Sequence, residues 1–139
     1  MSEQLTIEEL KSKIGQPWLT LTYPIERGMA QHFAEAVGDE NPRWQGEKAE
    51  APPALLLTIG FDRVISMLLG LPEAVLHGST ELECFAPVKV GDEITVTAKI
   101  SALRERSPMT FINLELEQHN QNGLLVARCR QLALLRGKA

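Results

Sequence analysis

The apolar positions in the first part of the chain form one helical segment and one alternating segment. Thr6 followed by Glu9 has the spacing of a capping box, which predicts a short helix that runs to about Lys13. Apolar side chains then alternate with threonines over residues 18–23, and this period of two predicts a strand. The chain is therefore expected to begin with a short helix and a short strand.

Two further helices are predicted before the middle of the chain. Pro24 and Glu26 suit the first turn of one helix, and Gly38 ends it. Residues 39–51 are polar and irregular, which predicts a loop. Residues 54–70 predict a third helix that is apolar on nearly every face. A helix of this kind is buried on all sides, so we expect a sheet to cover one side and a partner chain the other.

The second half of the chain alternates apolar and polar residues, which predicts a series of strands. The predicted strands cover residues 80–85, 94–100, 112–116 and 124–135. Asn122 and Gly123 predict a hairpin turn, because this pair readily adopts positive φ. Strands that follow one central apolar helix are typical of the α+β hot-dog fold, in which an antiparallel sheet wraps around that helix. With 139 residues, 44% of them hydrophobic, the chain fits one domain over residues 1–139.

Composition excludes several classes of function. A net charge of −4, with 5% aromatic residues and no basic block, argues against a nucleic-acid partner. The most apolar segment carries Asp62 and Arg63 in its middle, so we predict no membrane span, and the N-terminus lacks the pattern of a signal peptide. Cys84 and Cys129 are predicted to be reduced, buried thiols of a cytoplasmic protein.

Residues 33–42, with the sequence FAEAVGDENP, resemble the signature of the MaoC-like dehydratases and (R)-specific enoyl-CoA hydratases, which are hot-dog proteins. The chain more closely resembles the N-terminal, FAS1-like dehydratase subgroup of that superfamily. The further segments that carry this resemblance are IEEL at 7–10, APP at 51–53, LHGSTELE at 76–83, PVKVGD at 87–92, MTF at 109–111 and NGLLVA at 122–127. The resemblance covers nearly the whole chain and implies activity on acyl thioesters.

The resemblance also places the candidate catalytic residues. Asp39 matches the catalytic aspartate of the signature, although a loop carboxylate that accepts backbone N–H bonds is an alternative interpretation. Asn41 either orients the active loop or forms a turn before Pro42. The catalytic histidine of the signature would fall at position 44, where this sequence has Trp44. Members of the N-terminal subgroup often lack this histidine and act beside a catalytic hot-dog subunit.

Dehydration of a 3-hydroxyacyl thioester needs a base for the α-proton, an acid for the leaving hydroxyl and donors for the thioester oxygen. Backbone N–H groups at the start of the third helix suit the last role, because a helix N-terminus carries partial positive charge. Pro53, Ala54 and Leu55, at the start of this helix, are predicted to bind substrate. Trp44 is placed with them and is expected to cover apolar surface, because its indole N–H only donates.

Three histidines are candidates to replace the missing one. His32 shares a helical stripe with apolar residues and is expected to be partly buried, His77 precedes Gly78, and His119 is expected to be solvated. Four arginines either contact the phosphates of CoA or of a phosphopantetheine carrier, or form a solvated edge: Arg104, Arg106, Arg128 and Arg130. No residues have the spacing of metal ligands, so neither a metal nor another cofactor is predicted.

Three functions follow as hypotheses. In the first, the chain is a subunit of a dehydratase/hydratase that interconverts 3-hydroxyacyl and trans-2-enoyl thioesters of CoA or acyl-carrier protein, with the catalytic pair on a hot-dog partner. In the second, the chain is a homo-oligomeric hydratase that uses Asp39 with His32 or His77. In the third, it is a non-catalytic acyl-binding or scaffolding protein. The partner is accordingly a second copy in a homodimer or another hot-dog subunit in a heterodimer.

Overall fold

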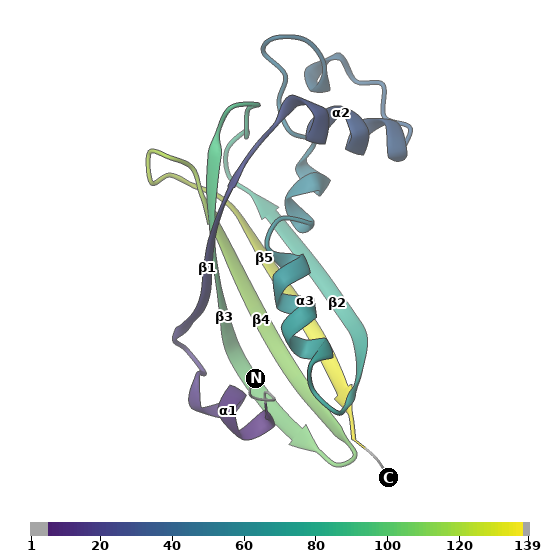
Figure 1. Cartoon of the computed structure of the whole chain (residues 1–139), viewed down its shortest axis with the longest axis vertical. Coiled ribbons are helices and arrows are strands. Elements are labelled where there is room, and N and C mark those ends of the chain that lie inside the picture. The colour runs from purple at the N-terminus through teal and green to yellow at the C-terminus, as the bar shows by residue number, and fades with distance from the viewer. Residues whose placement is uncertain (1–5, 138–139) are drawn as a thin grey trace.

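The computed structural model describes residues 6–137, which form one five-stranded antiparallel sheet with helices on one side and at both ends (Figure 1). The strands are β1 (Pro17–Pro24), β2 (Ala74–Cys84), β3 (Glu93–Arg106), β4 (Met109–His119) and β5 (Leu125–Arg136). The helices are α1 (Ile7–Ser12), α2 (Arg27–Ala36) and α3 (Phe61–Leu69), with short 3-10 helices η1 (Pro42–Trp44) and η2 (Pro53–Leu57). The strand order β1-β3-β4-β5-β2 places β1 and β2 at the two edges.

The sheet has an inner face that forms the core and an outer face that carries polar side chains. In β4, Ile112, Leu114 and Leu116 are fully buried on the inner face, whereas Glu115 and Glu117 alternate with them on the outer face. Such alternation is the expected result when one face of a sheet packs against helices. The predicted long strands of the second half are therefore confirmed.

The first elements follow the predicted order, with one shifted boundary. The Thr6 hydroxyl accepts a hydrogen bond from the Glu9 amide at 3.2 Å, which confirms the capping box at the start of α1. Pro24, which we placed in the first turn of the second helix, instead ends β1, and Glu26 is the residue before the helix. The helix therefore begins at Arg27. Within the described part of the chain, no helix is long and apolar enough to cross a membrane.

The third helix is broken, contrary to the prediction of one continuous helix over residues 54–70. The segment forms the 3-10 turn η2, then a turn at Gly60, and α3 begins only at Phe61. Gly60 has φ +85°, and a Cβ at this position would lie 2.8 Å from Val96 Cγ1 on β3. The break therefore brings the backbone into direct contact with the sheet, which only glycine allows.

The single chain covers only one side of α3. Val64 and Leu68 are buried against the sheet, but Leu69 is 65% exposed and Ile65 is half-buried. This agrees with the expectation that the sheet covers one side of the helix, and a partner on the other side stays a prediction. Figure 1 shows α3 along one face of the sheet, near the edge formed by β2.

Strand β2 begins at Ala74, not at residue 80 as predicted. The ladder with β5 continues upstream through a register shift between His77 and Ser79. Gly78 lies in this bulge, where a Cβ would be 2.9 Å from the backbone oxygen of Leu132. A close approach of two backbones thus extends a strand that the alternation pattern alone ended too early.

Candidate functional site

Asp39 lies directly after α2, in a loop that its own hydrogen bonds organise. One carboxylate oxygen accepts from the Asn41 amide at 3.0 Å, and the other accepts from the Trp44 indole at 2.8 Å. Asn41 in turn accepts from the Arg43 amide at 3.0 Å and caps η1. The structure therefore brings Asp39, Asn41 and Trp44 together, with an indole donor at the position where the resembled signature has a histidine.

Trp44 is the buried member of this loop. Its side chain is 6% exposed, and its ring lines two cavities, one of about 240 Å³ and one of about 600 Å³. Asp39 and Gly38 line the larger cavity, and Pro53 and Leu56 line the smaller one. Trp44 therefore covers apolar surface within the chain, and its predicted place at the site or at the seam between subunits stays a prediction.

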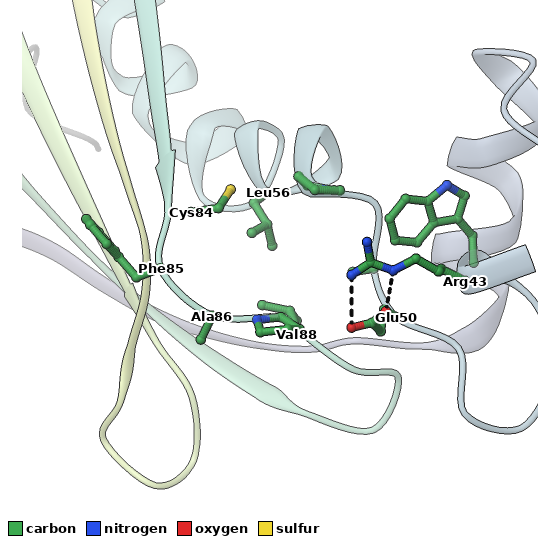
Figure 2. A pocket seen from close by; sticks show the side chains of 11 residues that line it. Arg43, Glu50, Leu56, Cys84, Phe85, Ala86 and Val88 are labelled. Atoms are coloured by element: carbon green, nitrogen blue, oxygen red, sulfur yellow. Dashed lines mark hydrogen bonds and ion pairs between the residues drawn. The ribbon is translucent and has the colours of Figure 1, made fainter. Parts of the chain in front are cut away.

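The smaller cavity is the candidate binding pocket, and we call it the Arg43 pocket (Figure 2). It is lined by Arg43, Trp44, Glu50, Ala51, Pro53, Leu56, Cys84, Phe85, Ala86, Pro87 and Val88. Of the predicted substrate-binding residues, Trp44 and Pro53 line it, whereas Ala54 is exposed beside it and Leu55 is buried in the core. The pocket wall therefore includes only part of the predicted set.

The pocket wall formed by η2 is held in place by a buried side chain on β4. Gln118 is 1% exposed, and its amide nitrogen donates to the backbone oxygen of Leu56 at 2.7 Å. A buried hydrogen bond of this kind is costly to lose, because the carbonyl would be left unpaired away from water. Gln118 was not among the predicted site residues, and the sequence pattern marks its position only as an inward-facing one.

Arg43 and Glu50 form an ion pair at the pocket that the sequence pattern did not reveal. Arg43 Nε lies 2.8 Å from Glu50 Oε2, and the guanidinium lies 5.4 Å from the centre of the Trp44 ring. Glu50 is only 20% exposed. The two residues are seven positions apart in an irregular loop, so no periodicity links them. Their pairing places a guanidinium at the pocket whose Nε and Nη2 already donate to Glu50, so a phosphate or carboxylate would bind through the remaining N–H groups.

The ion pair makes a pH-dependent contribution to stability. The Arg43 guanidinium lowers the pKa of Glu50 below its ordinary value of 4.5. A lowered pKa in the folded state stabilises the protein above pH 4.5, and this contribution is lost as the pH falls through the folded-state pKa. We therefore expect Glu50→Gln to melt at a lower temperature than the wild type at neutral pH.

The same linkage predicts that the melting curves of the wild type and Glu50→Gln converge as the pH falls to about 3. Thermal melts by circular dichroism over this pH range measure the effect. Glu47→Gln, at an exposed position in the same loop, is the matched control. Its melting temperature should change with pH in the same way as that of the wild type. A difference between the wild type and Glu50→Gln that persists at low pH would contradict the prediction.

None of the three histidines lines either cavity that Trp44 lines. His32 is exposed on α2, so the expectation that it is partly buried is wrong. His77 Nε2 lies 2.6 Å from Thr80 Oγ1, and His77 lines a separate apolar cavity of about 330 Å³ beside α3. His119 is half-buried at the end of β4, not fully solvated. The structure therefore does not join Asp39 with a histidine in one cavity.

The arginines predicted as phosphate contacts lie on the outer face of the sheet or at the end of β3. Arg128 and Arg130 share one face of β5, as predicted, and both form ion pairs with glutamates. Arg104 lies over the ring of Phe111, and Arg106 is exposed. Within residues 6–137, no three His, Cys, Asp or Glu side chains are grouped so that they could hold a metal ion.

The two cysteines differ in exposure. Cys129 is buried, as predicted, but Cys84 is exposed at the end of β2 and lines the Arg43 pocket, so its predicted burial is wrong. Desolvation raises the pKa of both thiols. A raised pKa keeps a thiol protonated at neutral pH, which makes it a poor nucleophile.

Comparison with known proteins agrees with this geometry. Residues 12–129 match the family described as the FAS1-like, dehydratase domain region. A UPF0336 protein of Streptomyces coelicolor is 30% identical over 118 residues, which cover 75% of this chain and 79% of the relative.

Solved structures show the fold. A MaoC-like dehydratase from Rhodospirillum rubrum superposes with a TM-score of 0.77 at 21% identity, over 97% of this chain and 99% of that chain. The HadBC (3R-hydroxyacyl-ACP dehydratase) complex from Mycobacterium tuberculosis matches with a TM-score of 0.72 at 16% identity, over 84% and 94%. These likenesses confirm the predicted hot-dog fold of the α+β class. The chain belongs to the family described as the FAS1-like, dehydratase domain region.

Proposed function

We propose that this chain is a supporting subunit of an acyl thioester dehydratase/hydratase, whose catalytic Asp–His pair lies on a hot-dog partner. The reaction interconverts 3-hydroxyacyl and trans-2-enoyl thioesters of CoA or acyl-carrier protein. The observation that carries the proposal is the 2.8 Å hydrogen bond from the Trp44 indole to the Asp39 carboxylate, at the position of the family's histidine. The pairing supports a structural role for this loop.

The chemistry of the two side chains explains why the pair is a poor catalyst. Dehydration requires one group that takes a proton and one that gives a proton at the reacting carbons and hydroxyl. The indole N–H is a donor only, with no acceptor atom in its ring plane, so it cannot exchange a proton at neutral pH. Asp39 also accepts the Asn41 amide, so both of its oxygens already hold the loop together.

The edge of the sheet supports the second part of the proposal, a hot-dog partner. Among residues 6–137, β5 is the one ladder partner of β2, so the other edge of β2 is free. Beside this edge, Leu69 and Leu76 are exposed, and Phe61 is half-buried. Free strand edges and apolar patches of this kind favour pairing with another chain. HadBC, to which the fold is similar, is itself a dehydratase complex.

The Arg43 pocket gives the supporting subunit a direct role in substrate binding. Pro53, Leu56 and Val88 form an apolar wall, on which an acyl or pantetheine chain would lie. Arg43 lies at the same pocket and supplies a guanidinium for the phosphate of the carrier. Trp44 closes the pocket on the side of Asp39. In this proposal the chain binds and orients the thioester, while the partner transfers the protons.

Reconstitution tests the proposal. The chain is combined with a MaoC-like subunit that carries the intact Gly-Asp-x-Asn-Pro-x-His signature, and hydration of crotonyl-CoA is followed for each component and for the complex. We expect the isolated chain to be at least ~10²-fold slower than the complex, because a general acid–base group contributes ~10²–10⁴ in rate. Asp39→Asn should leave the turnover of the complex within a few-fold of the wild type.

The aspartate of the signature on the partner is the matched control, because its replacement by asparagine should abolish turnover. Loss of more than about a hundredfold in turnover through Asp39→Asn, with an unchanged melting temperature, would contradict the supporting role. Robust turnover by the chain alone that is lost in His32→Ala or His77→Ala would instead establish the homo-oligomeric hydratase. A complex that binds acyl thioesters without turnover would favour the acyl-binding or scaffolding function.

A further inference from the structure

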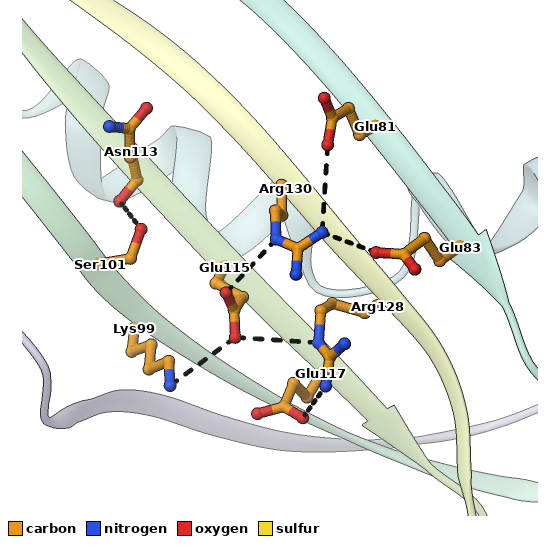
Figure 3. Close-up of polar contacts among 9 residues, drawn as sticks. All are labelled: Glu81, Glu83, Lys99, Ser101, Asn113, Glu115, Glu117, Arg128 and Arg130. Carbon is orange, nitrogen blue, oxygen red and sulfur yellow. Dashed lines mark hydrogen bonds and ion pairs between the residues drawn. The ribbon is translucent and has the colours of Figure 1, made fainter.

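The outer face of the sheet carries charges whose sign alternates from strand to strand. Strand pairing aligns them in two rows, which run Lys99–Glu115–Arg130–Glu81 and Thr97–Glu117–Arg128–Glu83 across β3, β4, β5 and β2. Figure 3 shows the charged members of both rows on neighbouring strands. The result is a set of stripes along the strands, negative on β4 and β2 and positive on β5, and Lys99 adds one positive charge on β3. We call them the charged stripes.

The charged stripes are only partly neutralised within the chain. Arg130 makes one close contact, 2.6 Å to Glu83, but lies 3.6 Å from Glu115. The other ion pairs in Figure 3 span 3.4 to 4.0 Å, longer than the 2.7–2.9 Å typical of charge-assisted hydrogen bonds. Donors and acceptors on this face therefore retain capacity for further partners.

The order of the stripes makes the outer face complementary to itself in one orientation. Two copies that stack by their outer faces are related by a two-fold axis lying between the two sheets. An axis that is parallel to the strands, between β4 and β5, reverses the strand order, so each stripe faces one of opposite sign. Glu117 then faces Arg128 of the second copy, and Lys99 faces Glu81 of the second copy. An axis perpendicular to the strands would place each strand over the same strand of the second copy, so that like charges face each other.

The same axis also pairs apolar side chains beyond the charged stripes. Phe111 on β4 is aligned with Leu134 on β5, and both lie half-buried on the outer face. Reversal of the strand order places Phe111 over Leu134 of the second copy. Leu132 lies between these residues and the charged stripes. Sheets that stack face to face are about 10 Å apart, a spacing that side chains of this size fill.

We infer that the outer face of the sheet binds the outer face of a second copy of this chain, about a two-fold axis parallel to the strands. This interface is separate from the free edge of β2 and requires no catalytic activity. It would join two chains, or two complexes that are formed at the β2 edge. Because charged groups dominate the contact, the association weakens as salt concentration rises.

Charge reversal across the axis tests the inference. Glu117→Lys and Arg128→Glu each place like charges opposite one another in the homomeric contact. We expect sedimentation velocity to show at least about tenfold weaker association for either variant alone. In an equimolar mixture, the two introduced charges face each other across one of the two contacts, and association should be restored towards that of the wild type. Glu35→Lys, at an exposed position on α2, changes the net charge by the same amount as Glu117→Lys and is the control for that variant.

Thr97 supplies a second test that leaves the ion pairs within the chain intact. It faces Glu83 of the second copy, so Thr97→Lys should tighten the association and Thr97→Glu should weaken it. Circular dichroism checks that every variant is folded. The inference is overturned if the wild type shows no association through this face, if the variants sediment like the wild type, or if the mixture of Glu117→Lys and Arg128→Glu associates no better than either alone.

Discussion

Replacement of Gly60 by alanine is expected to lower the free energy of unfolding by about 2–5 kcal/mol. Gly60 has φ +85°, and the left-handed region costs an L-residue roughly 1–2 kcal/mol. The new Cβ would also lie 2.8 Å from Val96 Cγ1, so the turn before α3 or strand β3 must move. Overpacking of this kind costs about 1–3 kcal/mol. Urea denaturation followed by circular dichroism measures the sum.

Gly28→Ala is the matched control for Gly60→Ala. Gly28 lies on α2, is exposed, and a Cβ there would meet nothing within 4 Å. Alanine is a better helix former than glycine, so this variant should be stabilised by up to about 1 kcal/mol. Gly60→Ala should cost less free energy of unfolding in a Val96→Ala background than in the wild type, because Val96→Ala removes the clash but not the backbone strain. If Gly60→Ala lowers the free energy of unfolding by less than about 1 kcal/mol, the turn can rearrange to accommodate a side chain, which would contradict the prediction.

Replacement of Trp44 by alanine is expected to cost about 3–5 kcal/mol and to join the two cavities that its ring lines. The ring is 6% exposed, so its removal leaves a void between η1 and the Arg43 pocket. Trp44→Phe keeps most of the packing and loses the hydrogen bond to Asp39. We expect this variant to lose about 1–2 kcal/mol of the free energy of unfolding. Urea denaturation of both variants, followed by circular dichroism, separates packing from hydrogen bonding.

Asp39→Asn provides the cross-check, because it weakens the same hydrogen bond from the other side. If the Asp39–Trp44 bond carries the effect, Asp39→Asn and Trp44→Phe combined should cost less than the sum of the two single changes. Full additivity would contradict a direct coupling between the two side chains. Trp44→His addresses function: it restores the family's acid–base group, and a rise in crotonyl-CoA hydration by the isolated chain would show that the loop still presents a ring nitrogen to Asp39.

Local signals in the sequence were enough to predict most of the elements. The capping box at Thr6, the alternation in β4 and the hairpin at Gly123 all act through neighbours within a few residues, and the structure confirms each. The signature around Asp39 also identified the loop that lines both cavities beside Trp44. Such features depend on backbone geometry and side-chain period, which the order of residues carries directly.

Contacts between distant segments decided the rest. The third helix breaks at Gly60 because the chain there touches Val96, a residue far along the sequence. Strand β2 extends upstream because β5 pairs with it through the bulge at Gly78. The continuous apolar run that precedes and forms α3 fits one unbroken helix as well as it fits a 3-10 turn followed by a helix. Its pattern alone therefore cannot reveal the break.

The chemistry of the site divides in the same way. The resemblance to the signature singled out position 44, where this chain has a tryptophan, which is only a donor, and the signature has a histidine. Only the tertiary structure decided that the indole donates to Asp39, and that Arg43 pairs with Glu50 beside the pocket. Those pairings depend on how an irregular loop folds back on itself, where neither the helical nor the strand period relates one residue to another.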